Sequence, residues 1–244
     1  IVFTSAFSSS SPTDPAGAVG PNHYVHMVNS TYTVYDKTGT SLGGPYTLGS
    51  LLGGSNDGDP IVMYDVDADR WFLSQFKFSN SSFQVAVSQT ADPLGAYYAY
   101  EFPLNSFPDY PKYSVWGNAY YVSANKSAPQ LYALERIEML AGNPNAQIIG
   151  FNVPSLSTNG FFSILPAHAT SGAPSSNTPG YTFYFQDDGW GGVSSDNIKI
   201  WEINLDWSTT SNSTIASPQV LPVSAFDSEF TASWDDIEQP GTSS

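Results

Sequence analysis

The feature that most constrains the fold is a repeat of strand–turn–strand units along the chain. Four stretches pair a turn with an aromatic-rich strand: GAVGPNHYVHMVN (17–29), IVMYDVDADRWFLSQF (61–76), YSVWGNAYYVSAN (113–125) and TPGYTFYFQ (178–186). Their turns centre near Asn22, Asp69, Asn118 and Gly180, so successive turns are 47, 49 and 62 residues apart. These spacings suit the four-stranded blades of a β-propeller, which take about 40–50 residues each.

The repeat predicts an all-β fold, a β-propeller of four-stranded blades in a single domain over 1–244. About four blades are visible in the chain, at about 17–50, 58–102, 109–154 and 161–225. The tail, 226–244, is expected to start a further blade or to close the ring. In the third unit the sequence ERIEMLAG predicts one or two helical turns that end at Gly142.

Composition narrows the classes of partner. Of 244 residues 41% are apolar, enough for a core, and 15% are aromatic, typical of strands. The formal charge of −15 argues against nucleic acid and anionic lipid as partners. There is no cysteine, so disulfides and thiolate metal sites are excluded. No apolar run approaches the roughly 20 residues of a membrane span. The chain starts at Ile1 rather than Met, as expected of a mature, secreted protein.

Several stretches resemble a group of secreted bacterial-type β-propeller proteins. They are DPAGAVGPNHYVHMVNSTYTVYDKTG, GDPIVMYDVDADRWFLSQF, VAVSQTADPLGAYYAYEF and FPDYPKYSVWGNAYYVSAN, and they cover most of residues 14–142. The resemblance implies the propeller fold and an extracellular or cell-surface location, but it supplies no catalytic residue. The sequence departs from the group at LPAHATSG, where His168 stands in place of Asp.

Members of this group look longer than this chain, which suggests a piece of a larger ring of six or seven blades. A smaller closed propeller, a truncated chain and a nicked protein completed by a second chain are all compatible with four units, and we favour the last two. An open propeller would expose sheet edges and the apolar faces between blades. A structural role, in which blade edges pair with another chain, is therefore one functional alternative.

The motif DKTGT at 36–40 matches the site at which P-type transport ATPases are phosphorylated. Those enzymes also need membrane helices and a second Mg²⁺-binding loop, and this chain has neither pattern. Asp and Gly between two β-rich runs are typical of a hairpin turn. We therefore interpret Asp36 as the capping residue of a turn between the third and fourth strands of the first unit.

The loops that lead into the innermost strands of a propeller converge on one opening of its central channel. Here they contain SSPTDPAG, SNDGDP, FPDYPK, LPAHATSG and SWDDIEQPG. Carboxylates from these loops are candidate ligands for Ca²⁺, which takes six to eight oxygens: Asp14, Asp57, Asp59, Asp109, Asp235 and Asp236. The alternative is that each Asp caps its own turn.

A ligand is expected to bind on loops of the rigid β scaffold. The loop QDDGWGGVSSDN at 186–197 is long and rich in Gly and Asp, so we expect Trp190 to be exposed there rather than in the core. Trp71, Trp116 and Trp201 alternate along strands and are expected in the core. The candidate ligand-binding residues are Tyr110, Asp187, Asp188 and Trp190.

These features favour a secreted β-propeller that binds an extracellular ligand, most plausibly a glycan, with Ca²⁺ as a candidate cofactor. The enzymatic alternative is a glycan hydrolase or polysaccharide lyase that uses Asp109, Lys112 and His168 at the same opening. No hydrolase, zinc-protease or nucleotide motif is present, so no nucleotide or redox cofactor is expected. Four sequons could carry glycans, at Asn29, Asn80, Asn125 and Asn212.

Overall fold

The computed structural model describes residues 12–160 and 162–228. These residues form four antiparallel sheets, of which the first three have four strands each. The first sheet contains β1 (Pro15–Val19), β2 (His23–Val28), β3 (Thr31–Asp36) and β4 (Ser41–Thr47). The second contains β5 (Ile61–Asp65), β6 (Arg70–Lys77), β7 (Ser82–Ser88) and β8 (Tyr97–Pro103). The third contains β9 (Asp109–Trp116), β10 (Ala119–Asn125), β11 (Leu131–Glu135) and β12 (Ile148–Phe151).

The fourth sheet has a divided outer strand. It contains β13 (Leu165–Pro166), β14 (Gly180–Gln186) and β15 (Asn197–Asn204), and β15 pairs with both β16 (Thr214–Ile215) and β17 (Gln219–Pro222). The sheets coincide with the four predicted units to within a few residues, and the all-β class is confirmed. The helical elements of the described part are α1 (Gly49–Leu52), α2 (Arg136–Leu140) and a short 3-10 turn at Thr210–Asn212.

The predicted helical turns in ERIEMLAG correspond to α2, whereas α1 was not predicted. No helix in the part of the chain that the structure describes is long and apolar enough to cross a membrane.

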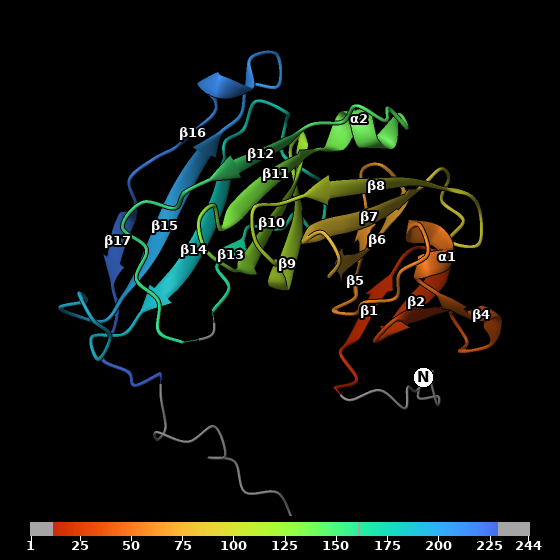
Figure 1. The fold of residues 1–244 in the computed structure, drawn as a ribbon, viewed down its shortest axis with the longest axis horizontal. Helices are drawn as coiled ribbons and strands as arrows, with labels where there is room; N and C mark the ends of the chain where they lie inside the picture. Colours follow the sequence, from red (N-terminus) through yellow and green to blue (C-terminus); the bar gives the residue numbers. More distant parts are fainter. Residues whose placement is uncertain (1–11, 161, 229–244) are drawn as a thin grey trace, which may run out of the picture.

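The four sheets follow an arc, with the first strand of each sheet on its inner side (Figure 1). Strands β1, β5, β9 and β13 are in contact in that order, and the last strands lie on the outside. Because successive first strands run in the same direction, the loops before them reach the same end of the arc. Within residues 12–160 and 162–228, no hydrophobic cluster joins the first sheet to the fourth, so these residues do not form a closed ring.

The core is divided among the three spaces between neighbouring sheets. Alternation along β6 shows how one strand serves two of them: Trp71 and Leu73 pack toward the first sheet, and Phe72 packs toward the third. The third space is filled from β14 and β15 by Tyr184 and Trp201. Because the second and third sheets are covered on both faces, their middle strands are buried along almost their whole length.

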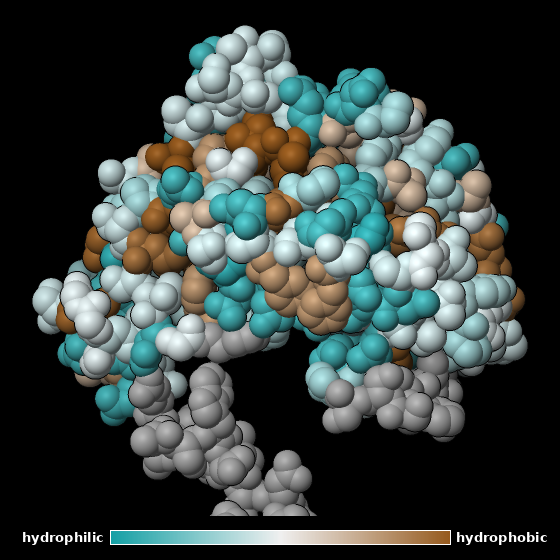
Figure 2. Space-filling view, in the orientation of Figure 1, coloured by the Kyte–Doolittle hydropathy of each residue, from teal (hydrophilic) through white to brown (hydrophobic). Residues whose placement is uncertain are grey.

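The far face of the fourth sheet carries exposed apolar side chains. Leu165 pairs with Phe183 across β13 and β14, and Phe185 lies in register with Ile198 and Leu221 across β14, β15 and β17. Figure 2 shows hydrophobic patches on the side of the molecule that holds the fourth sheet, and others on the side of the first sheet. The fourth sheet therefore has an apolar face that no other described sheet covers.

The DKTGT motif forms the turn between β3 and β4, as predicted. Asp36 Oδ1 accepts hydrogen bonds from the backbone N–H of Thr38 (2.8 Å) and Thr40 (2.9 Å), and Gly39 takes a φ of 93° that favours glycine. The side-chain hydrogen bond from Thr38 and the backbone bonds lower the pKa of Asp36. These contacts account for the motif as a turn cap.

A buried ion pair joins the second sheet to the third. Arg136, the first residue of α2, donates from Nε to Asp65 Oδ2 (2.6 Å) and from Nη2 to Asp65 Oδ1 (2.7 Å). Tyr120 donates its hydroxyl to the same carboxylate (2.8 Å), and Arg136 Nη1 donates to the carbonyl of Gly117 (3.0 Å). The pair therefore fixes the end of β5 and the β9–β10 turn at once.

Candidate functional site

The amino ends of the first three inner strands bring three carboxylates together. Asp14 directly precedes β1, Asp59 lies two residues before β5, and Asp109 is the first residue of β9. Asp14 and Asp109 both act electrostatically on Asp59. Three of the residues predicted to surround one opening therefore do converge.

Three residues of this region share the same strained backbone conformation. Asp14, Asp59 and Tyr110 have φ values of 41°, 47° and 51°, and each directly precedes a proline. A residue before proline prefers an extended conformation, and left-handed values are uncommon for side chains other than glycine. Strain of this kind is often found at functional sites, so its repetition marks this end of the molecule.

Asp59 is the most perturbed carboxyl of the group. Burial raises its pKa, and the negative charges of Asp14 and Asp109 raise it further. The backbone N–H of Tyr110 donates to Asp59 Oδ2 (3.2 Å), and this bond and the charge of Lys112 act in the opposite direction. The net effect is a raised pKa, so the surroundings of Asp59 favour its protonated form.

Tyr110 and Lys112 extend the same group toward solvent. Tyr110 is 42% exposed, and Lys112 Nζ lies 3.2 Å from the centroid of its ring. A cation over an aromatic face is held by the electrons of the ring. The charge of Lys112 also acts on Asp59, so the ammonium group lies near that carboxyl.

Next to these residues lies a pair of stacked aromatic rings, of which Phe78 is exposed and Phe107 is half-buried. Phe78 follows β6 and Phe107 precedes β9, and their rings are 4.7 Å apart with an angle of 6° between their planes. The buried Phe76 packs edge-on against both rings. Phe78 is 60% exposed, so the stack offers an apolar surface to solvent.

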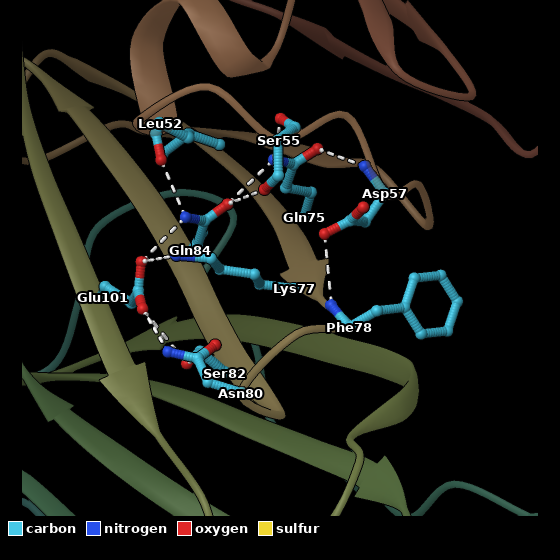
Figure 3. Close-up of polar contacts among 10 residues, drawn as sticks. All are labelled: Leu52, Ser55, Asp57, Gln75, Lys77, Phe78, Asn80, Ser82, Gln84 and Glu101. Carbon is cyan, nitrogen blue, oxygen red and sulfur yellow. Dashed lines mark hydrogen bonds and ion pairs between the residues drawn. The ribbon is translucent and has the colours of Figure 1, made fainter.

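A hydrogen bond fixes the segment that carries Phe78. Asp57 Oδ2 accepts from the backbone N–H of Phe78 (3.1 Å), while the ring of Phe78 points away from the polar network (Figure 3). The same Asp57 donates its own N–H to Gln75 (3.3 Å). Asp57, predicted as a metal ligand, therefore holds the aromatic stack.

Two buried glutamines support this arrangement from β6 and β7. Gln75 Nε2 donates to the carbonyl of Ser55 (2.8 Å) and to Gln84 Oε1 (2.9 Å), and Gln84 Nε2 donates to the carbonyl of Leu52 (2.7 Å) and to Glu101 (2.9 Å) (Figure 3). Through these hydrogen bonds, the two buried amides hold the segment between α1 and β5 in one conformation. We name the whole region the amino-end surface, and it consists of Asp14, Asp57, Asp59, Phe78, Phe107, Asp109, Tyr110 and Lys112.

Glu101 ends this network and predicts a pH dependence of stability. Burial opposes its ionisation, but hydrogen bonds from Lys77, Asn80 and Gln84 outweigh burial and lower its pKa from 4.5 to about 2. A carboxyl whose pKa is depressed by folding stabilises the protein above its unfolded pKa, and this contribution is lost as the pH falls through the folded pKa.

We therefore expect the difference in free energy of unfolding between the wild type and Glu101→Gln to shrink as the pH falls from about 5 to about 2. Denaturant unfolding at a series of pH values measures it. A difference that stays constant over this range would contradict the assigned role of Glu101.

His168 does not join this surface, which corrects the expectation that it acts with Asp109 and Lys112. The backbone N–H of Val115 donates to His168 Nδ1 (3.1 Å), so His168 lies beside the far end of β9. Burial lowers the pKa of His168, although Asp65 opposes this effect, and a neutral ring is what allows Nδ1 to accept. Asp235 and Asp236, also predicted as metal ligands, lie outside the described residues.

The fourth sheet holds a separate group of carboxylates at the predicted loop. Asp187, Asp188 and Asp196 each have an oxygen within 4.8 Å of the others, the only such group of three found over residues 12–160 and 162–228. The oxygens of Asp187 accept backbone N–H groups of Gly189 (2.7 Å) and Ser228 (2.6 Å). Asp196 likewise accepts from Asp188 (2.8 Å) and Phe226 (2.8 Å), so these two buried carboxylates tie the loop to the segment after β17.

Trp190 is buried, and the prediction that it is exposed is wrong. It is 7% exposed and packs with Tyr184 in the cluster between the third and fourth sheets, while its Nε1 donates to Ser228 Oγ (3.1 Å). Trp71 and Trp201 are fully buried and Trp116 is partly buried, as expected.

Three of the four sequon asparagines have an occupied side-chain amide. Asn29 Nδ2 donates to the carbonyl of Pro12 (3.0 Å), Asn80 Nδ2 to Glu101 Oε1 (2.5 Å) and Asn212 Nδ2 to Asp206 Oδ2 (3.0 Å). Asn125 is the last residue of β10 and is half-buried. Asn80 also accepts from Ser82, the third residue of its own sequon.

Sequence reasoning missed the aromatic stack. Phe76 and Phe78 alternate at the end of β6 and resemble a core strand that continues. The signal that could have separated them is the position of Phe78, which stands one residue beyond Lys77 at the start of the polar turn SNSS.

Comparison with known proteins gives one structural likeness. No protein-family model matches the chain, and no curated protein sequence matches it. Among solved structures, it is similar to the catalytic domain of a GH62 alpha-L-arabinofuranosidase from Coprinopsis cinerea, at 10% sequence identity and a TM-score of 0.40. The match covers 88% of this chain and 70% of that one. Similarity at this level does not establish a shared activity.

Proposed function

We propose that the protein binds an extracellular glycan at the amino-end surface. The observation that carries the proposal is the stack of exposed Phe78 on half-buried Phe107, next to the group formed by Asp59, Asp109 and Lys112. Flat aromatic rings pack against the apolar faces of sugar rings, and carboxylate and ammonium groups bind hydroxyls as acceptors and donors.

Two segments of the chain carry most of the amino-end surface. Phe107 and Asp109 lie on the segment that enters β9, and Asp57 and Asp59 lie on the segment that enters β5. The hydrogen bond from Tyr110 N–H to Asp59 joins the two segments. A ligand resting on the aromatic stack would therefore have the polar groups beside it.

The surface is also held in place before any ligand arrives. Asp57 fixes Phe78, and buried Gln75 and Gln84 fix the loop that carries Asp57. Order of this kind reduces the entropy lost on binding. The net charge of −15 favours neutral or cationic glycans over polyanionic ones.

Titration calorimetry against a panel of soluble oligosaccharides tests the proposal. We expect Phe78→Ala and Tyr110→Ala each to weaken binding about tenfold, because each removes one aromatic contact. Phe183→Ala and Tyr46→Ala are matched controls, since Phe183 is 40% exposed and Tyr46 is 42% exposed on other parts of the surface. Equal losses in the variants and their controls would overturn the proposal.

The perturbed carboxyl of Asp59 favours hydrolysis as a second candidate function. Glycoside hydrolysis needs a protonated acid and an ionised carboxylate near the scissile bond. Asp59, with its raised pKa, fits the acid, and Asp14 and Asp109 are the carboxyl groups that act electrostatically on it. New reducing ends released by the wild type but not by Asp59→Asn would establish this activity, and binding with unchanged sugar ends would exclude it.

A further inference from the structure

We propose that a second site, for a single uncharged sugar unit, lies in a polar cleft between the third and fourth sheets. The cleft encloses about 260 Å³. Its polar side chains come from the β9–β10 turn, from β10, from the segment before β14 and from the end of β15. They are Asn118, Tyr121, Ser176, Asn177, Thr178 and Asn204.

The cleft is distant from the amino-end surface. Asp109 is the first residue of β9, whereas Asn118 lies in the turn that follows its last residue, Trp116. Eight residues of strand separate the two sites by about 23 Å or more, at about 3.3 Å per residue. This inference does not rest on the function proposed for the other end.

The walls of the cleft are fixed by hydrogen bonds to buried groups. Arg136 Nη1, on the side chain held by Asp65, donates to the carbonyl of Gly117 (3.0 Å), and the backbone N–H of Arg136 donates to the carbonyl of Asn118 (3.2 Å). On the other wall, Trp116 Nε1 donates to the carbonyl of Pro179 (2.8 Å). The turn and the segment before β14 therefore present their side chains from an ordered backbone.

At the floor of the cleft, the strands β10 and β14 approach each other closely. Tyr121 is buried, and its hydroxyl lies against Gly180, where any Cβ would overlap it. Burial raises the pKa of Tyr121, so its hydroxyl stays protonated. It can thus both donate and accept at neutral pH.

The chemistry of the lining indicates an uncharged ligand. None of the residues that line the cleft is charged, although the chain carries 22 acidic residues. Asn118 and Asn177 each offer one acceptor and two donors, and Asn204, whose Nδ2 is bound to Glu202 (3.1 Å), retains its carbonyl as an acceptor. Alternating donors and acceptors without charge match the hydroxyls of a neutral sugar.

The size of the cleft limits the ligand. Its volume lies just below the roughly 300–1,000 Å³ of sites for drug-sized molecules, which suits one sugar ring better than an oligosaccharide. With a ligand site at each end, one molecule could hold two glycan chains together, and binding to a polymer would gain from avidity.

Two-dimensional NMR with methyl glycosides of glucose, xylose, mannose and N-acetylglucosamine tests the proposal. At least one of these probes should shift the side-chain amide signals of Asn118 and Asn177. The double variant Asn118→Ala/Asn177→Ala should raise the dissociation constant of that probe about tenfold or more, because two hydrogen-bonding amides are lost.

Asn22→Ala is the matched control, because exposed Asn22 stands in the corresponding β1–β2 turn of the first sheet. It should leave the dissociation constant unchanged. The proposal is overturned if no probe shifts the two amide signals, or if the double variant, with an unchanged melting temperature, binds the probe as the wild type does.

Discussion

Replacing Arg136 by Met is expected to lower the free energy of unfolding by about 3–5 kcal/mol. The substitution keeps much of the volume and removes the cation, so the buried carboxyl of Asp65 keeps only the Tyr120 hydroxyl and the backbone N–H of Ala68 as hydrogen-bond partners. The carbonyl of Gly117 also loses the hydrogen bond from Arg136 Nη1, whereas the backbone N–H of residue 136 still donates to the carbonyl of Asn118. Denaturant unfolding at neutral pH, followed by fluorescence, measures the change.

The double variant Asp65→Leu/Arg136→Met is the control for this prediction. It removes both charges, so it should be markedly more stable than Arg136→Met alone. A single variant that loses less than about 1 kcal/mol would contradict the role of the pair as a link between the second and third sheets.

Replacing Trp190 by Ala is expected to cost about 3–5 kcal/mol of unfolding free energy as well. The indole is buried between the third and fourth sheets, and truncation leaves a cavity beside Tyr184. It also leaves Ser228 Oγ without the indole donor. The same unfolding measurement applies, and glycan binding at the amino-end surface should not change.

Asp188→Asn, in the same loop as Trp190, is the control for Trp190→Ala. Asp188 is exposed, so its substitution should change stability by no more than about 0.5 kcal/mol. If Trp190→Ala instead unfolded like the wild type but lost ligand binding, the loop would be a binding loop, and the interpretation of Trp190 as a core residue would be wrong.

The sheets could be predicted from the sequence because local signals agree with the long-range packing. Asp36 and Gly39 define one turn, and the alternation of Trp71, Phe72 and Leu73 places side chains on both faces of β6. The short strand β13 could not be predicted, since two residues carry no alternation.

The exposure of Trp190 could not be predicted from the sequence for a related reason. A Gly- and Asp-rich stretch is typical of an exposed loop, but here Asp187 and Asp196 bind backbone groups of residues near 226–228 and fold the indole inward. The partners of those carboxylates are 30 and 41 residues away along the chain, so no local pattern reveals them.

The candidate site could be predicted in part. Topology alone places Asp14, Asp59 and Asp109 at one end, because they lie at the starts of the successive inner strands β1, β5 and β9. It misplaced His168, because the fourth sheet begins at Leu165 and His168 lies beyond β13, not before it. The aromatic stack depends on the meeting of a turn after β6 with a segment before β9, which only the packing of the second and third sheets determines.

A crystal structure of the protein with the oligosaccharide that binds it most tightly tests the central claim most directly. We expect a sugar ring over the stack of Phe78 and Phe107, with hydroxyls in hydrogen-bonding range of Asp59, Asp109 or Lys112. An oligosaccharide bound elsewhere, with the amino-end surface empty, would contradict the proposed function.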